Sequence, residues 1–476
     1  MRRLSAWESS ILLASSVLAW FLVRSSSFFH WFVLPLWACG VLMGVDAVRW
    51  ARGKIHVLDP AGLLGLLFLV RFYWAYLYKV DSGFWLRHPD QPPDWRPWVG
   101  CLSAIYLGAI LLYRWAVREA QEDQRRRGGA SVAWRIEARR FFQALVPLIF
   151  AALVAQVALY ARFGGISGFI EAYERREIAG VAWLAAVGEP LPILALMSWA
   201  VYARQRRIRP SWVAIAGALI TFFIAQLFLG GLRGSRTNTI WACIWAAGIV
   251  HVWVRPIPRK LFLSAIPFLV LFLYLWGFYK GAGREGLRAM FAPSRWGELA
   301  EATRRTLDVA WIPGGTEAML VYRLAQPESD YSCAWGRTYL GALAKLVPRE
   351  IWPDRPPGVV LEGTEALYGR GSYSEVFRSS LVYGLLGEGM LNFGIYLAPL
   401  TYLLLGYVVG RVRRALRTWS RDDARWLLAP FLANLCVQLQ GGDSTNVLFF
   451  LVKDGAVPVL LLWAGSRRET RASSRR

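Results

Sequence analysis

The chain has 476 residues, of which 56% are hydrophobic, and its mean hydropathy is +0.34. Soluble domains are about 45–50% apolar, so this composition excludes an ordinary soluble protein and favours a membrane protein. The formal net charge of +23 would suggest nucleic-acid binding in a soluble protein. Here the basic residues lie in short clusters between apolar runs, as the positive-inside rule predicts, so we expect no nucleic-acid partner.

The sequence contains no motif that indicates a metal ion or a cofactor. The 5 cysteines show no paired spacing and the 4 histidines are scattered, so we expect neither a disulfide framework nor a metal site. There is no Walker A motif, no Gly-x-Ser-x-Gly and no nucleotide-sugar Asp-x-Asp motif in a soluble domain. An enzyme built on this chain is therefore expected to need no metal or cofactor and to use a lipid-linked substrate.

Apolar runs of membrane-spanning length recur along the chain and predict about twelve transmembrane helices. They cover residues 9–23, 29–48, 57–79, 98–117, 141–162, 182–203, 211–230, 238–254, 261–280, 381–410, 425–441 and 446–464. No convincing cleavage site follows the first run, which we interpret as a helix and not as a signal peptide. The predicted fold is an all-α, polytopic integral membrane protein with one membrane domain over residues 1–476.

Basic clusters fix the expected orientation, because Lys and Arg concentrate in cytoplasmic loops. They fall in alternate loops, such as Arg204–Arg209 and Arg411–Arg417, and at both ends of the chain. We therefore place both termini in the cytoplasm. The segment 281–380, which is too polar for a membrane, then forms a large external loop.

The external loops contain recognisable local patterns. Residues Gly168–Ile178 predict a short amphipathic helix at the membrane surface. Within the large loop, Ala310–Arg323 and Thr338–Val347 predict short helices, and prolines and glycines between residues 353 and 371 argue against one long helix. The basic end Ser466–Arg476 is expected to be a solvated tail.

The first candidate site is the glycine- and arginine-rich turn Gly230–Asn238 between two predicted spans. Glycines let backbone N–H groups approach a ligand closely, and the following helix start favours anions. Arg233 and Arg236 supply fork-shaped donors that match phosphate oxygens. The turn is therefore a candidate phosphate or pyrophosphate cradle. The alternative is a tight turn whose arginines meet lipid headgroups.

The second candidate site is Glu375–Gly394, which begins outside and runs into a predicted span. Glu388 and Asn392 are four residues apart, so a helix places them on one face. A carboxylate in the membrane is costly and is usually functional or paired. It can accept a proton from a sugar hydroxyl. The alternative is helix packing, with the glycines allowing close approach.

Other charged residues lie within predicted spans. For Arg71 and Glu189 we expect a structural ion pair with each other, and Lys453 and Asp454 are expected to satisfy neighbours in the bundle. Asp443, at the outer mouth of the last span, is a weaker candidate acid or ligand-binding residue.

Three stretches resemble the Wzy-type polymerases that join O-antigen and exopolysaccharide repeat units. They are the turn Gly230–Asn238, the segment Phe163–Ile178 with its Phe-Gly-Gly start, and Leu346–Pro356 followed by Ser379–Gly394. The last is the most specific, because its order at the end of a large external loop is similar to that of the family. The motifs cover about a fifth of the chain.

The resemblance implies a GT-C-like enzyme of the bacterial inner membrane that polymerises undecaprenyl-pyrophosphate-linked oligosaccharides on the periplasmic face. The loop 281–380 would then be periplasmic. Its partners would be the lipid-linked oligosaccharide, membrane lipids and a chain-length-regulating membrane protein. The expected roles are assigned as follows: pyrophosphate binding by Arg233, Arg236, Arg378 and Arg284; a base at Glu388 or Glu375; acceptor binding by Asn392 and Asp443.

Other readings remain open. O-antigen ligases share the architecture but are expected to use a histidine of the external loop, and residues 281–380 contain none. A peptidoglycan polymerase of the SEDS group is possible. A flippase or other transporter of lipid-linked oligosaccharides could also have about twelve spans, but transporters usually show repeats and short loops.

Overall fold

The computed structural model is 76% helix and 3% strand. It describes residues 14–15, 27–83, 85, 88, 90–126, 132–174, 182–230, 236–258, 260–261, 264, 267–268, 271–272, 315–347, 351–373 and 381–470, with the backbone alone at 123–126, 173–174, 182, 236–238 and 470. The chain divides into two compact units. Unit 1 comprises residues 1–128, 308–415 and 435–449, and unit 2 comprises 129–307, 416–434 and 450–476.

Within the described residues, eight helices are long and apolar enough to cross a membrane. They are Val33–Ala51, Pro60–Ser82, Arg96–Glu122, Ala138–Arg162, Trp183–Gln205, Trp212–Leu229, Gly384–Thr418 and Ser444–Gly465. Each coincides with one of the twelve predicted runs, so the all-α membrane class is confirmed. A ninth run forms a shorter apolar helix, Thr239–Val254. Most of residues 9–23 and most of residues 261–280 lie outside the described residues.

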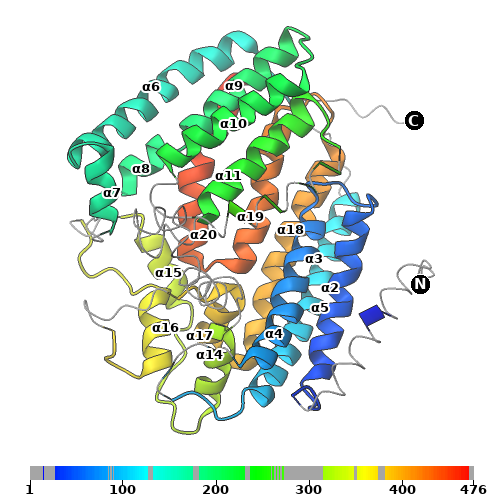
Figure 1. The fold of residues 1–476 in the computed structure, drawn as a ribbon, viewed down its shortest axis with the longest axis vertical. Coiled ribbons are helices and arrows are strands. Elements are labelled where there is room, and N and C mark those ends of the chain that lie inside the picture. Colours follow the sequence, from blue (N-terminus) through cyan, green and yellow to red (C-terminus); the bar gives the residue numbers. More distant parts are fainter. Residues whose placement is uncertain are drawn as a thin grey trace, which may run out of the picture. The chain divides into compact units, whose positions relative to one another are not determined.

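Unit 1 is a bundle in which α2, α3, α5 and α18 run side by side (Figure 1). Its elements are α2 (Val33–Ala51), α3 (Pro60–Leu69), the π-helical turn η1 (Val70–Trp74), α4 (Ala75–Ser82), α5 (Arg96–Arg126), α14 (Gly315–Ala325), α15 (Arg337–Ala344), α16 (Val359–Tyr368), α17 (Gly384–Leu397), the 3₁₀ turn η5 (Ala398–Leu400), most of α18 (Thr401–Thr418), the end of α19 (Ala429–Gly441) and most of α20 (Ser444–Phe450).

Small residues set the helix spacing in this bundle. A Cβ on Gly406 would lie 2.5 Å from the carbonyl oxygen of Tyr113, and one on Gly410 would lie 2.9 Å from that of Val117. These two glycines form a Gly-x-x-x-Gly stripe on α18, which lets its backbone lie directly against α5. Beside this contact, Phe72 stacks on Tyr106 with ring centroids 3.9 Å apart.

Unit 2 packs α6 against α8, α9 and α21. Its elements are β1 (Val132–Ile136), α6 (Ala138–Arg162), α7 (Ile166–Glu174), α8 (Ala182–Gly188), α9 (Leu191–Gln205), α10 (Trp212–Leu229), α11 (Arg236–Ile249), the π-helical turn η3 (Val250–Val254), the 3₁₀ turn η6 (Ala424–Leu428), the start of α19, the π-helical turn η7 (Leu451–Gly455), α21 (Ala456–Gly465) and β2 (Ser466–Thr470). Figure 1 shows α9, α10 and α11 as neighbours.

The predicted solvated tail was wrong over Ser466–Thr470. This segment forms β2, which pairs antiparallel with β1 from Val132↔Thr470 to Ile136↔Ser466. The short helix predicted over Gly168–Ile178 corresponds to α7, Ile166–Glu174, and its position at the membrane surface stays a prediction. In the large loop, the two predicted short helices correspond to α14 and α15, and α16 was not predicted.

Candidate functional site

Glu388 and Asn392 lie one turn apart on α17, as their spacing predicted, and both side chains are buried. The helix begins at Gly384 and bends at Gly394, whose φ of 76° and ψ of 173° are accessible essentially to glycine alone. The bend ends the buried segment immediately after Asn392. It lets the chain turn into η5 and α18.

The Glu388 carboxylate is held by uncharged donors from two other elements. The Thr338 hydroxyl, at the start of α15, donates to Oε1 at 2.7 Å. Ser444, at the start of α20, donates its backbone N–H to Oε2 at 2.6 Å and its hydroxyl to Oε1 at 2.5 Å. Among the described residues no ion pair involves Glu388. These hydrogen bonds therefore carry the stabilisation of the buried carboxylate.

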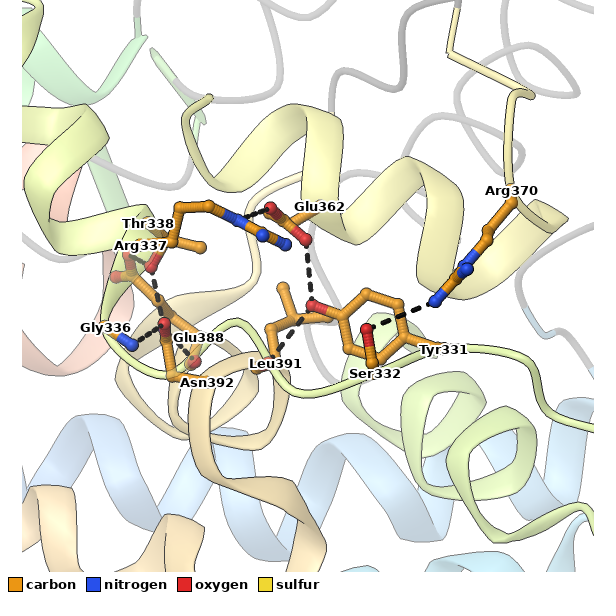
Figure 2. Close-up of polar contacts among 10 residues, drawn as sticks. All are labelled: Tyr331, Ser332, Gly336, Arg337, Thr338, Glu362, Arg370, Glu388, Leu391 and Asn392. Atoms are coloured by element: carbon orange, nitrogen blue, oxygen red, sulfur yellow. Dashed lines mark hydrogen bonds and ion pairs between the residues drawn. The ribbon is translucent and has the colours of Figure 1, made fainter. Parts of the chain in front are cut away.

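Asn392 extends this arrangement into a chain of hydrogen bonds (Figure 2). Its amide nitrogen donates to the Thr338 hydroxyl at 2.7 Å and to the carbonyl of Glu388 at 2.9 Å, and its oxygen accepts from the Gly336 N–H at 2.8 Å. The Thr338 hydroxyl thus accepts from Asn392 and donates to Glu388. We call Thr338, Glu388, Asn392 and Ser444 the Glu388 network.

A second buried carboxylate, Glu362 of α16, lies beside this network (Figure 2). Arg337 donates from Nε to its Oε1 at 2.6 Å, and the Tyr331 hydroxyl lies 3.2 Å from Oε2. Burial, together with the charge of Glu362, raises the pKa of Tyr331 above its ordinary value. The Arg337 side chain is 50% exposed, so it connects the buried Glu362 with the surface of the unit.

Asp443 caps the start of α20, next to Ser444. Its carboxylate accepts from the Asn446 N–H at 3.0 Å and from the Asn446 amide at 2.9 Å. Burial raises the pKa of Asp443, and the charge of Lys345 opposes that rise. The geometry assigns Asp443 a structural role at the helix start that supplies Ser444 to Glu388. Its predicted contact with an acceptor stays a prediction.

The predicted pairing of Arg71 with Glu189 was wrong. Arg71, in η1, forms an ion pair with the buried Glu317 of α14 in unit 1. In unit 2, Glu189 pairs with Lys453 of η7 at 2.9 Å, and both side chains are 2% exposed. These four buried charges therefore have opposite partners, as expected inside a membrane bundle, but the partners come from elements that spacing in the sequence does not relate.

Four predicted site residues, Arg233, Arg284, Glu375 and Arg378, lie outside the described residues, and Arg236 begins α11 with only its backbone described. The proposed pyrophosphate cradle therefore remains a prediction.

Several residues of the site were not predicted, namely Thr338, Ser444, Tyr331, Arg337 and Glu362. Asp443 is an N-cap signal, which could have placed Ser444 at the start of a helix. Thr338 and Glu362 gave no comparable signal, because they contact Glu388 and Arg337 only through the tertiary fold.

Chemically, the site presents a buried carboxylate with hydroxyl and N–H donors, and the described part of the chain places no cation in an ion pair with it. Such a group can hold and accept a proton. No group of three or more His, Cys, Asp or Glu side chains that could hold a metal ion is found in the described part of the chain.

No protein-family model matches the chain, and neither a curated protein nor a solved structure matches it.

Proposed function

We propose that the chain is a membrane glycosyltransferase that polymerises undecaprenyl-pyrophosphate-linked oligosaccharide units on the periplasmic face of the bacterial inner membrane. One observation carries the proposal. The Glu388 network joins the stretch with the most specific resemblance, Ser379–Gly394, to Thr338 of the large loop and to Ser444. A buried carboxylate in such a motif, with no cation paired to it among the described residues, fits a proton acceptor better than a purely structural ion pair.

In the proposed reaction, a hydroxyl oxygen of the incoming unit attacks the anomeric carbon of the growing chain. The bond from that carbon to the pyrophosphate oxygen breaks, and lipid pyrophosphate leaves with the bonding electron pair. Glu388 accepts the hydroxyl proton, while Thr338 and Ser444 fix the direction of its oxygens. Arg233, Arg236, Arg284 and Arg378 are proposed to stabilise the charge on the leaving group, which is the main electrostatic task of such a step.

A transporter of lipid-linked oligosaccharides is the second candidate. It is favoured by the buried pairs Arg71–Glu317 and Lys453–Glu189, because charged residues inside membrane bundles often mark transport pathways. The π-helical turns η1 and η7, which carry Arg71 and Lys453, are also common at functional sites.

A deletion strain distinguishes the two candidates. Its polysaccharide and lipid-linked intermediates are separated on a gel, and the side of the membrane that holds the intermediates is determined. Polymerase action predicts loss of the polymer ladder with single units on the periplasmic side. Single units held on the cytoplasmic side would contradict it and support transport. An unchanged ladder would contradict both.

A further inference from the structure

The two strands of unit 2 form a short ribbon at the ends of two helices of spanning length. β2 starts at Ser466, directly after α21, and β1 is separated from α6 by Glu137 alone. The Glu137 N–H donates to the carbonyl of Gly465 at 3.0 Å, and a Cβ on Gly465 would lie only 2.8 Å from the Cα of Phe141. The β1–β2 ribbon is therefore held where α6 and α21 leave the hydrocarbon core, at the level of the lipid headgroups.

Strand pairing places two arginines side by side. Arg135 lies directly opposite Arg467, and Trp134 lies directly opposite Arg468. Directly opposite residues share a face of a ribbon and successive residues alternate between faces, so the two pairs project from opposite faces. Like charges directly opposite each other destabilise a strand pair. The first pair therefore carries a local cost that a bound anion would remove.

The face with Trp134 attaches the ribbon to η6 of the same unit. Arg425 donates to the carbonyl of Val132 at 2.6 Å, and its guanidinium lies 5.9 Å from the centre of the Trp134 ring. The Arg468 guanidinium lies 5.2 Å from the same ring. Asp423 fixes Arg425 by accepting from its Nε at 2.9 Å and from its Nη2 at 2.7 Å. The cations on this face are thus engaged within the protein.

The other face is exposed and carries an excess of positive charge. The Arg135 side chain is 55% exposed, and Arg467 is exposed. Glu469 pairs with Arg135 at 3.0 Å, and Glu137 pairs with Arg140 at 3.1 Å. Both glutamates of the ribbon and of its junction with α6 are thus already paired. Within the described ranges, no ion pair involves Arg467.

The adjoining chain adds only positive charge to the ribbon. Residues 125–131 and 471–476 contain three arginines each and no acidic residue. A ligand of the exposed face must therefore be an anion. Guanidinium groups match phosphate oxygens in a bidentate geometry, and phosphate diesters are the anions of the headgroup layer in which the ribbon lies.

We propose that the face with Arg135 and Arg467 binds the phosphate diester of an anionic glycerophospholipid headgroup. The site is separate from the Glu388 network and does not rest on the proposed function. In the orientation predicted from the basic clusters, the lipid belongs to the cytoplasmic leaflet. Its binding offsets the repulsion between the two arginines and holds the ends of α6 and α21 at the membrane surface.

Native mass spectrometry of the full chain in neutral detergent tests the proposal by measuring Kd for phosphatidylglycerol and phosphatidylcholine. The parent chain should bind phosphatidylglycerol about tenfold more tightly or better. Arg467→Glu should weaken this binding by about tenfold or more, because it replaces a cation with an anion. The same change places a carboxylate opposite Arg135, so the Tm in phosphatidylcholine nanodiscs should equal or exceed that of the parent.

Arg467→Gln is the milder variant, which removes the charge without reversing it, and should weaken phosphatidylglycerol binding by about fivefold. Arg209→Glu is the matched control, because it makes the same charge reversal at an exposed position between α9 and α10 of the same unit. It should leave the affinity unchanged.

Four results would overturn the proposal. The parent chain could bind the two lipids equally, or both Arg467 variants could bind phosphatidylglycerol as the parent does. Equal weakening by Arg209→Glu and Arg467→Glu would show a general attraction between charges and no site on the ribbon. Displacement of the lipid by inorganic phosphate would identify a site for soluble anions.

Discussion

At the scale of single residues, the candidate site depends on one hydroxyl. Thr338 accepts from Asn392 and donates to Glu388, so it sets the direction of both side chains. The face shared by Glu388 and Asn392 follows from their spacing and was predicted. Thr338 was not predicted as part of the site, because 50 residues of chain separate it from Glu388.

Thr338→Val tests this role. Valine keeps the shape but removes the hydroxyl, which leaves the buried Asn392 amide without one acceptor at a cost of about 1–3 kcal/mol. We expect a lower thermal stability and at least a tenfold loss of polymerisation in membranes. Thr364→Val is the control, because among the described residues the buried Thr364 hydroxyl bonds only within α16, to the carbonyl of Val360. Equal activity in the two variants would contradict the role of Thr338.

His88 predicts a dependence of stability on pH. Its Nε2 lies 2.9 Å from the carbonyl oxygen of Leu367, its Nδ1 accepts from the Asp90 N–H, and its ring stacks on Tyr368. Burial lowers the pKa of His88 from 6.5, with the charge of Arg323 acting in the same direction and Asp90 opposing it.

The unfolded chain therefore takes up a proton near pH 6.5, whereas the folded chain holds this ring neutral to lower pH. The free energy of unfolding should fall as pH is lowered from 7.5 to 5.5. Thermal unfolding in nanodiscs measures this fall as a small decrease in Tm. His88→Gln keeps a donor for Leu367 and should reduce the pH dependence; an identical profile in that variant would refute the assignment.

At the scale of elements, local sequence patterns predicted the existence of most helices but not their partners. The runs that became α6 and α10 have the length and hydropathy of spans without reference to the rest of the chain. The pairing of β1 with β2 could not be predicted in this way. It joins segments more than 300 residues apart, and the basic composition of β2 is also that of a solvated tail.

The bend at Gly394 is the element-scale feature on which the site depends. A Cβ at this position would meet only Cys333 Sγ at 3.7 Å, so crowding is not the obstacle. The obstacle is the pair of backbone angles, which disfavours any residue with a Cβ. We therefore expect Gly394→Ala to lower the free energy of unfolding by about 1–3 kcal/mol and to displace Asn392. Gly108→Ala, in a helix with open space around the position, is the matched control and should be neutral or slightly stabilising. Equal thermal stabilities would show that the bend is not required.

The pair of Lys453 with Glu189 connects η7 to the turn between α8 and α9 in unit 2. Lys453→Met leaves a buried carboxylate without its cation, at a cost of about 3–5 kcal/mol. The double variant Lys453→Met/Glu189→Gln removes both charges and should recover most of the stability. Thermal unfolding of the two variants tests whether Lys453 and Glu189 act as an ion pair. A double variant that is no more stable than the single variant would contradict this role.

At the scale of the whole molecule, hydropathy was sufficient to establish the class of protein, and eight predicted runs coincide with helices of spanning length. The grouping of the chain into two units was not predictable, because each unit collects three separate segments. The large loop illustrates the same limit. Its polarity excluded a span, but the burial of Glu317 and Glu362 against partners in unit 1 follows from the tertiary fold alone.

Polymerisation by purified protein tests the central claim most directly. The full chain is reconstituted into liposomes with an undecaprenyl-pyrophosphate-linked repeat unit, and the length of the lipid-linked glycan is measured by mass spectrometry. The parent chain and the exposed control Glu328→Gln should both extend the unit into a ladder. Glu388→Gln should leave single units, since the amide cannot accept the hydroxyl proton. A full ladder from Glu388→Gln, or no extension by the parent chain, would contradict the account.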